Sequence, residues 1–200
     1  MNNMLFVSGV IATMLTSTLL HAEVETYKID NKHSFANWSI RHVVAKTSGT
    51  FTDITGKVEI DRKNLANSSV QAKINVLSVN SAHAKRDEHI LKDDYLNAAK
   101  YSDMTFVSTK VVALNETEGE MTGKFTMNGV TREITFPFKV LGFGSDPWGG
   151  FRSGFEAKTS LKASDYGFPW PQKPNAPVGD DIEITLLIEG IRAYPEPKPL

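Results

Sequence analysis

The stretch Met121–Val140, which reads MTGKFTMNGVTREITFPFKV, decides the fold. Every second residue from Met121 to Met127 is apolar or glycine, which is the period of a β-strand with one buried face. Asn128-Gly129 follows at once and favours a two-residue hairpin turn, because both central positions of that turn require positive φ. The stretch therefore predicts an antiparallel hairpin. The return strand carries its apolar residues on one face: Val130, Ile134, Phe136, Phe138 and Val140.

The same alternation recurs along the rest of the chain. It is found in residues 36–44, 54–60, 70–76, 104–109, 155–161 and 182–188. With the hairpin, about eight strands have one apolar and one polar face, which is typical of antiparallel sheets. Eight such strands can close into a barrel that is filled by side chains or holds one small ligand. We therefore predict an all-β, eight-stranded antiparallel barrel, with a β-sandwich as the alternative.

Three segments interrupt the strands. Residues 81–101 have helical character and predict one or two short helices lying on the barrel. The proline-rich stretch 163–181 is either a lid over a cavity or a plain surface crossover. The turn Asp146–Arg152 is either a structural hairpin, with Trp148 covering a barrel end, or a gate. Within the return strand, Pro137 cannot donate to a ladder and predicts a bulge or an open seam.

Composition excludes several classes of protein. The chain has 200 residues, 40% of them hydrophobic, and 22 basic residues against 23 acidic ones. This balance lacks the basic footprint of a nucleic-acid-binding protein, and no Lys/Arg run indicates docking on an anionic surface. The absence of cysteine excludes disulfides, thiolate catalysis and Cys-based zinc sites.

The N-terminus indicates export. Residues 4–20 are apolar and rich in hydroxyl groups, and a small residue, Ala22, follows at the expected cleavage edge. This pattern is typical of a secretory signal peptide, although no Lys or Arg precedes the apolar run. We therefore predict a removable signal peptide over residues 1–22, a single domain over residues 23–200, and a periplasmic location. Nothing after residue 22 is long enough to span a membrane, so stable membrane insertion is not expected.

No catalytic or metal-binding constellation emerges from the motifs. His83 and His89 flank a helical stretch, but their spacing is not a zinc signature. No Gly-x-Ser-x-Gly elbow and no phosphate-cradling glycine loop is present. We therefore predict no cofactor, no bound metal and no enzymatic activity.

His42 and Arg132 are exceptions on an otherwise apolar face. Alternation directs both side chains inward. Because a buried charge is costly unless it is paired, these residues lie at a barrel mouth or meet the polar head of a ligand. The two interpretations agree if the head group sits at the mouth.

Several separate motifs then resemble one family, the YceI-like proteins of the bacterial periplasm. They are KHSF (32–35), AHAKRDEHIL (82–91), YLN (95–97), KY (100–101), TF (105–106), NGVT (128–131) and DPWGGFRSGFEA (146–157). The resemblance covers about residues 27–191, with Ser102 standing where members commonly carry proline. It implies a lipocalin-like barrel with a helical flap, which binds polyisoprenoids, isoprenoid quinones or fatty amides.

The sequence thus predicts a carrier for a long-chain hydrophobic small molecule held inside the barrel. The alternatives are an enzyme acting on such a lipid, with His42 as the acid–base group, and a stress-related structural protein with a filled barrel. A homodimer is also considered, and no nucleic-acid partner is expected. Alternation assigns the ligand contacts to Trp38, Ile40, His42, Val58, Ala72, Ile74, Phe106, Phe125, Met127, Arg132, Ile134, Phe136, Phe155, Ile184 and Leu186.

Overall fold

The structure is a computed structural model that describes residues 24–193. The predicted signal peptide, residues 1–22, lies outside this range. Within the described range, no helix has the length and apolar character required to cross a bilayer.

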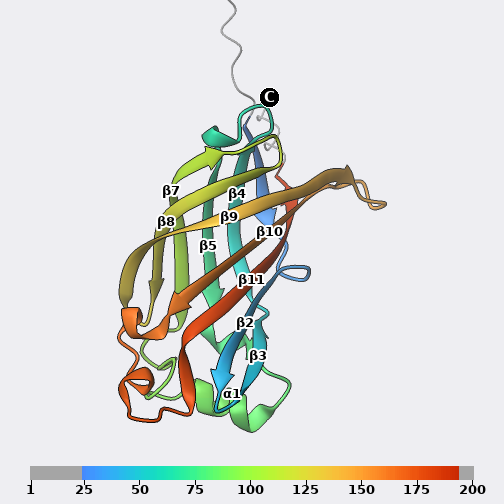
Figure 1. The fold of residues 1–200 in the computed structure, drawn as a ribbon. Helices are drawn as coiled ribbons and strands as arrows, with labels where there is room; N and C mark the ends of the chain where they lie inside the picture. Colours follow the sequence, from blue (N-terminus) through green and yellow to red (C-terminus); the bar gives the residue numbers. More distant parts are fainter. Residues whose placement is uncertain (1–23, 194–200) are drawn as a thin grey trace, which may run out of the picture.

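Strands make up most of the described chain (Figure 1). Their bounds are β1 Val24–Ile29, β2 Phe35–His42, β3 Ala45–Phe51, β4 Ile54–Asp61, β5 Ser69–Asn75, β6 Val79–Asn80, β7 Asp103–Ala113, β8 Glu118–Met127, β9 Val130–Ser145, β10 Phe151–Lys162 and β11 Val178–Arg192.

Eight of these strands close into an antiparallel barrel, which confirms the predicted fold class. The order is β1-β4-β5-β7-β8-β9-β10-β11, and β11 pairs back with β1 to complete the ring. The closing ladder is short, since it joins Tyr27, Lys28 and Ile29 only to residues 190–192 at the end of β11.

The remaining strands form a branch on the barrel. The first part of β11 pairs with β2, β2 pairs with β3, and β3 pairs with β6. Residues 46–49 belong to β3 and do not turn the chain. The turn is Val43-Val44, which lies between paired His42 and Ala45.

The β8–β9 hairpin has the predicted turn. Asn128 and Gly129 both have positive φ, 53° and 73°. Pro137 marks an open seam, as one of the two expected alternatives: β9 pairs with β10 only from Phe138 onward. N-terminal to Phe138, β9 pairs only with β8. The missing N–H of Pro137 therefore interrupts no β9–β10 ladder.

Two irregular segments cover one end of the barrel (Figure 1). The first contains the helix α1, Ala84–Ile90, which His83 caps by accepting a hydrogen bond from the Arg86 N–H. The second contains the 3₁₀ helices η3 (Ala163–Tyr166) and η4 (Trp170–Gln172). Phe168 and Trp170 of this second segment are buried, so it packs into the barrel end instead of crossing its surface.

The turn at 146–152 joins β9 to β10 and is closed by hydrogen bonds to Asp146. Asp146 accepts hydrogen bonds from the backbone N–H groups of Trp148 and Gly150 and from Arg152 Nε. Trp148 does not cover the barrel end, since 81% of it is exposed. The hydrogen bonds to Asp146 fix the turn, while the Trp148 indole lies exposed to solvent.

Candidate functional site

The barrel encloses a cavity of about 610 Å³. Every barrel strand contributes to its lining, as do β2, β3 and the two segments at the covered end. The lining is predominantly aliphatic and aromatic, and the volume lies within the range of small-molecule sites. The inner faces of the alternating strands therefore surround a space instead of meeting in a fully packed core.

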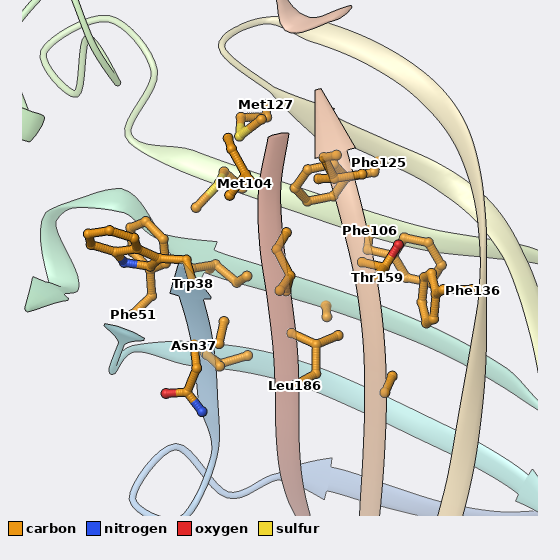
Figure 2. Close-up of a pocket in the computed structure, with 18 of the residues that line it drawn as sticks. Asn37, Trp38, Phe51, Met104, Phe106, Phe125, Met127, Phe136, Thr159 and Leu186 are labelled. Carbon is orange, nitrogen blue, oxygen red and sulfur yellow. The ribbon is translucent and has the colours of Figure 1, made fainter. Parts of the chain in front are cut away.

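Aromatic rings form opposite walls of this cavity (Figure 2). Trp38 and Phe51 lie on one side, while Phe106 and Phe136 lie on the other, with their ring centroids 5.3 Å apart. Gly49 makes room for the indole, because a Cβ at this position would lie 2.5 Å from Trp38 Cζ2. The missing side chain at Gly49 therefore allows the Trp38 indole to form part of the cavity wall.

Most residues that alternation assigned to the interior lie on the cavity wall. They are Trp38, Ile40, His42, Val58, Ala72, Ile74, Phe106, Phe125, Met127, Ile134, Phe136, Phe155, Ile184 and Leu186. Their contact with a ligand remains a prediction.

Arg132 is placed differently from the expectation. It pairs with Phe125 in the β8–β9 ladder, but its side chain is exposed and does not line the cavity. Its Nε donates a hydrogen bond to the carbonyl oxygen of Asp165 in η3 at 3.0 Å. Alternation gives the face of a residue, whereas a long side chain at a strand end reaches beyond the interior. The position does not support a role for Arg132 in holding a head group.

Sequence reasoning missed the lining residues outside the predicted strands. They are contributed by α1 and the turns after it, by β3 and by the 163–177 segment. The principal ones are Phe51, Arg86, His89, Ile90, Tyr95, Leu96, Trp170 and Pro177. Ile90, Tyr95 and Leu96 belong to the stretch predicted to form short helices on the barrel, but nothing in the sequence indicated that they would line a cavity.

The mouth of the cavity lies at the end covered by α1. Three lining residues that are themselves exposed gather there: His42 at the end of β2, His89 in α1 and Pro177 before β11. The opposite end is closed by a buried cluster that includes Tyr27 and Leu65. A molecule inside the barrel would therefore enter and leave beside α1.

An aromatic stack borders this mouth. His89 meets the edge of Tyr95, Tyr95 stacks on Trp170 at 5.2 Å, and Trp170 stacks on Phe168 at 4.5 Å. Trp170 Nε1 donates to the carbonyl oxygen of Gly179 at 3.0 Å, which fixes the indole against β11. Burial raises the pKa of Tyr95. The stack joins the helical segment to the 163–177 segment across the barrel end.

A charged cluster lies away from the cavity lining. Asp30, His33 and Glu189 offer ligand atoms within 4.8 Å of one another. Arg152 Nη1, however, donates to Asp30 Oδ2 at 2.7 Å and also to Glu189. The three carboxylates that Arg152 contacts, including Asp146, raise its pKa, with the bond to Asp30 as the largest cause. The guanidinium already supplies the positive charge there, and the cluster ties β10 to β11 and the β1 end.

Comparison with known proteins agrees with this architecture. The model of the YceI-like domain matches residues 27–190. A UPF0312 protein of Ectopseudomonas mendocina (strain ymp) is 40% identical over 186 residues, which is 90% of this chain and 96% of that protein. BcnA of Burkholderia cenocepacia is similar in structure, with a TM-score of 0.73 and 22% identity over 80% of this chain and 98% of that one.

A second solved structure is a polyisoprenoid-binding domain from Saccharophagus degradans implicated in plant cell wall breakdown. Its TM-score is 0.64 at 17% identity, and the match covers 84% of this chain and 98% of that one. These two structures share the fold, whereas the family model and the UPF0312 relative match most of the sequence. The chain therefore belongs to the YceI-like family.

Proposed function

We propose that this protein is a carrier that holds one long apolar molecule inside its barrel. The observation that carries the proposal is the cavity of about 610 Å³ with its aliphatic and aromatic lining. Each buried CH₂ group of a ligand contributes roughly 0.8 kcal/mol, so a long chain gains affinity without directional chemistry. Part of that gain offsets the entropy lost on association.

Family membership supports the same class of ligand. Polyisoprenoid, isoprenoid quinone and fatty amide are candidate cargoes, because all combine a long apolar chain with a small polar end. The polyisoprenoid-binding domain from Saccharophagus degradans shares the fold. Three of the polar residues that line the cavity, His42, Arg86 and His89, lie at the mouth. We expect the polar end of the cargo to lie there.

A binding role is favoured over an enzymatic one by the placement of the titratable groups. His42 and His89 are exposed at the rim and are not enclosed within the cavity. The Arg86 guanidinium is hydrogen-bonded to Ser81: Nε donates to the hydroxyl at 2.7 Å and Nη2 donates to the carbonyl oxygen. A turnover that depended on pH and disappeared in His42→Ala would contradict a pure carrier role.

The direct experiment is extraction of the purified protein with organic solvent, followed by mass spectrometry. Wild type should release a long-chain lipid in near-stoichiometric amount. Ala72→Trp fills the cavity from β5 and should abolish recovery while the fold persists. Val107→Trp is the matched control, since Val107 is exposed on the neighbouring strand and does not line the cavity. Equal recovery from both variants would contradict the cavity as the binding site.

We also propose that the protein is exported and acts in the periplasm. The support is the apolar run over residues 4–20, followed by Ala22, which is typical of a signal peptide. N-terminal sequencing of protein from a periplasmic extract should begin near Glu23. Recovery of the uncut chain in the membrane fraction would contradict this proposal.

A further inference from the structure

The β2–β3 hairpin exposes two valines at its tip. Val43 and Val44 form the two-residue turn, and they are 54% and 97% exposed. Val43 has a φ of 54°, in the left-handed region that β-branched residues avoid. Turns of this length usually take Gly, Asn or Asp, as this chain does at Asn128-Gly129. The hairpin tip is therefore both apolar and strained where polar and relaxed residues would suffice.

The tip is held firmly in place. The Val43 N–H donates to the carbonyl oxygen of Pro177 at 2.6 Å. Arg41 donates from Nη1 to the Val43 carbonyl at 3.0 Å and from Nη2 to the Ala176 carbonyl at 3.1 Å. Strain that the surroundings maintain in this way is a feature of functional surfaces.

The hairpin tip borders the mouth of the cavity. His42, directly before it, and Pro177, its hydrogen-bond partner, are two of the exposed lining residues that define the mouth. Figure 1 shows β2 ending at the same end of the barrel as α1. Whatever the tip touches therefore lies next to the opening.

Positive charge lies directly behind the valines. Arg41 and Lys46 pair across the ladder on the two strands of the hairpin. Lys46 forms an exposed ion pair with Glu183. Among residues 24–193, Arg41 has no carboxylate partner, and its guanidinium binds backbone carbonyls instead. An apolar tip with cations behind it complements a bilayer, whose acyl chains lie beneath anionic head groups.

We propose that the Val43-Val44 tip is a membrane-contact site. The two valines enter the interfacial region of a bilayer, while Arg41 and Lys46 face its anionic head groups. The contact is reversible and brings the mouth to the membrane, so that apolar cargo passes between bilayer and barrel without crossing water. The purpose assigned to the contact rests on the proposed carrier function, but the contact itself can be measured separately.

The test is co-sedimentation with vesicles of phosphatidylcholine and phosphatidylglycerol. Wild type should bind, and binding should weaken on vesicles of phosphatidylcholine alone and at high salt. Val43→Gly combined with Val44→Asn should lower partitioning at least about tenfold, because it removes both apolar side chains. Leu114→Asn is the matched control. Leu114 is 64% exposed in the β7–β8 turn, at the opposite end of the barrel, and its loss should leave binding unchanged.

Misfolding of the tip variant is excluded by its unfolding midpoint. Gly tolerates positive φ, so the double substitution should unfold at the same or a higher denaturant concentration than wild type. Equal vesicle binding by wild type and the double variant would overturn the inference, as would no binding by either.

The Ala72→Trp protein separates this inference from the proposed function. It lacks room for cargo but retains the tip, so it should bind vesicles as wild type does. If wild type carries no lipid yet binds vesicles through the valines, the carrier proposal fails and the contact site stands. Vesicle binding that is lost in Ala72→Trp but kept in the double variant would show that cargo makes the contact, which would overturn the inference.

Discussion

Asp30 links the stability of the barrel to pH. Its carboxylate is 9% exposed and lies 2.7 Å from Arg152 Nη1 and 2.8 Å from His33 Nδ1. Burial alone would raise the pKa of Asp30, but the hydrogen bonds from His33 and Arg152 outweigh it and lower the pKa to about 2. A carboxyl whose pKa is lowered by folding stabilises the native state above its ordinary pKa, and this contribution is lost as the pH falls through the folded value.

We therefore expect Asp30 to contribute roughly 2 kcal/mol to the free energy of unfolding near neutral pH, and to lose it between about pH 4 and pH 2. Urea titrations across this range measure it. Asp30→Asn should reduce the stability at pH 7 and flatten the acid limb of the profile. An unchanged slope in the variant would assign the acid sensitivity to other carboxylates.

Gly49 shows how one small residue sets the shape of the cavity wall. A Cβ at this position would lie 2.5 Å from Trp38 Cζ2 and 2.7 Å from the Asn80 carbonyl oxygen. Since the backbone of β6 cannot yield easily, Gly49→Ala should push the indole into the cavity. We expect a loss of about 1–3 kcal/mol in the free energy of unfolding, together with weaker lipid retention.

Chemical denaturation and lipid extraction measure these two effects of Gly49→Ala. Gly144→Ala is the control, because a Cβ there meets no atom within 4 Å. The control should match wild type in both measurements. If the two substitutions behave alike, the approach of Trp38 to Gly49 is not a constraint on the cavity.

Alternation predicted correctly which strand side chains face the cavity, with the exception of Arg132 near the start of β9. Trp38 and Phe136 lie on the cavity wall because the pleat fixes their direction. Arg132 shares the parity of such residues, yet its guanidinium reaches Asp165 of η3. No periodicity in the sequence could reveal that contact, since the two residues meet only in the folded chain.

Among the elements, the 163–177 segment contributes Trp170 and Pro177 to the cavity lining at its mouth. Trp170 is 7% exposed, stacks between Tyr95 and Phe168, and lines the cavity near its mouth. Trp170→Ala should therefore cost about 3–5 kcal/mol of stability and speed the release of bound lipid. Release into excess acceptor vesicles, followed over time, measures the second effect.

Trp148→Ala is the control for the Trp170→Ala substitution. Trp148 is 81% exposed at the β9–β10 turn, so its removal should change stability by no more than about 0.5 kcal/mol and leave lipid release unaffected. A Trp170→Ala protein that releases lipid at the wild-type rate would mean that the aromatic stack is structural and does not gate the mouth.

Three strands escaped sequence prediction, and one of them, β6, has only two residues and so shows no alternation. β3, AKTSGTF, buries only Phe51 and carries small or polar residues elsewhere, so it has no apolar alternation to detect. β1, VETYKI, is short and places its buried Tyr27 against the closing ladder. The turn that precedes β3 is Val43-Val44, and a valine pair does not resemble the glycine and asparagine turns from which hairpins are predicted.

At the scale of the whole molecule, ring closure depends on contacts far apart in sequence. Residues 27–29 meet residues 190–192, and Gly190 is close-packed, since a Cβ there would lie 2.8 Å from Tyr27 Cβ. The count of alternating strands predicted a barrel correctly, but it included β2, which lies on the branch, and omitted β1, which closes the ring. Local periodicity specifies strands and faces, whereas strand order depends on the packing of the complete chain.

If the cavity of about 610 Å³ holds a ligand, the stability of the whole barrel should depend on that occupant. A ligand that binds only the native state adds about 2.7 kcal/mol at a concentration one hundredfold above its Kd. For a domain of this size, the melting temperature should rise by roughly 5–10 °C when delipidated protein is refilled.

Differential scanning calorimetry on delipidated protein, with and without the extracted lipid, measures this shift. Ala72→Trp should show no shift, because its indole occupies the space that the lipid would fill, and Val107→Trp should shift as wild type does. If delipidated wild type melts at the same temperature with and without lipid, the barrel is stable regardless of its occupant. The alternative of a structural protein that carries no ligand would then account better for the fold.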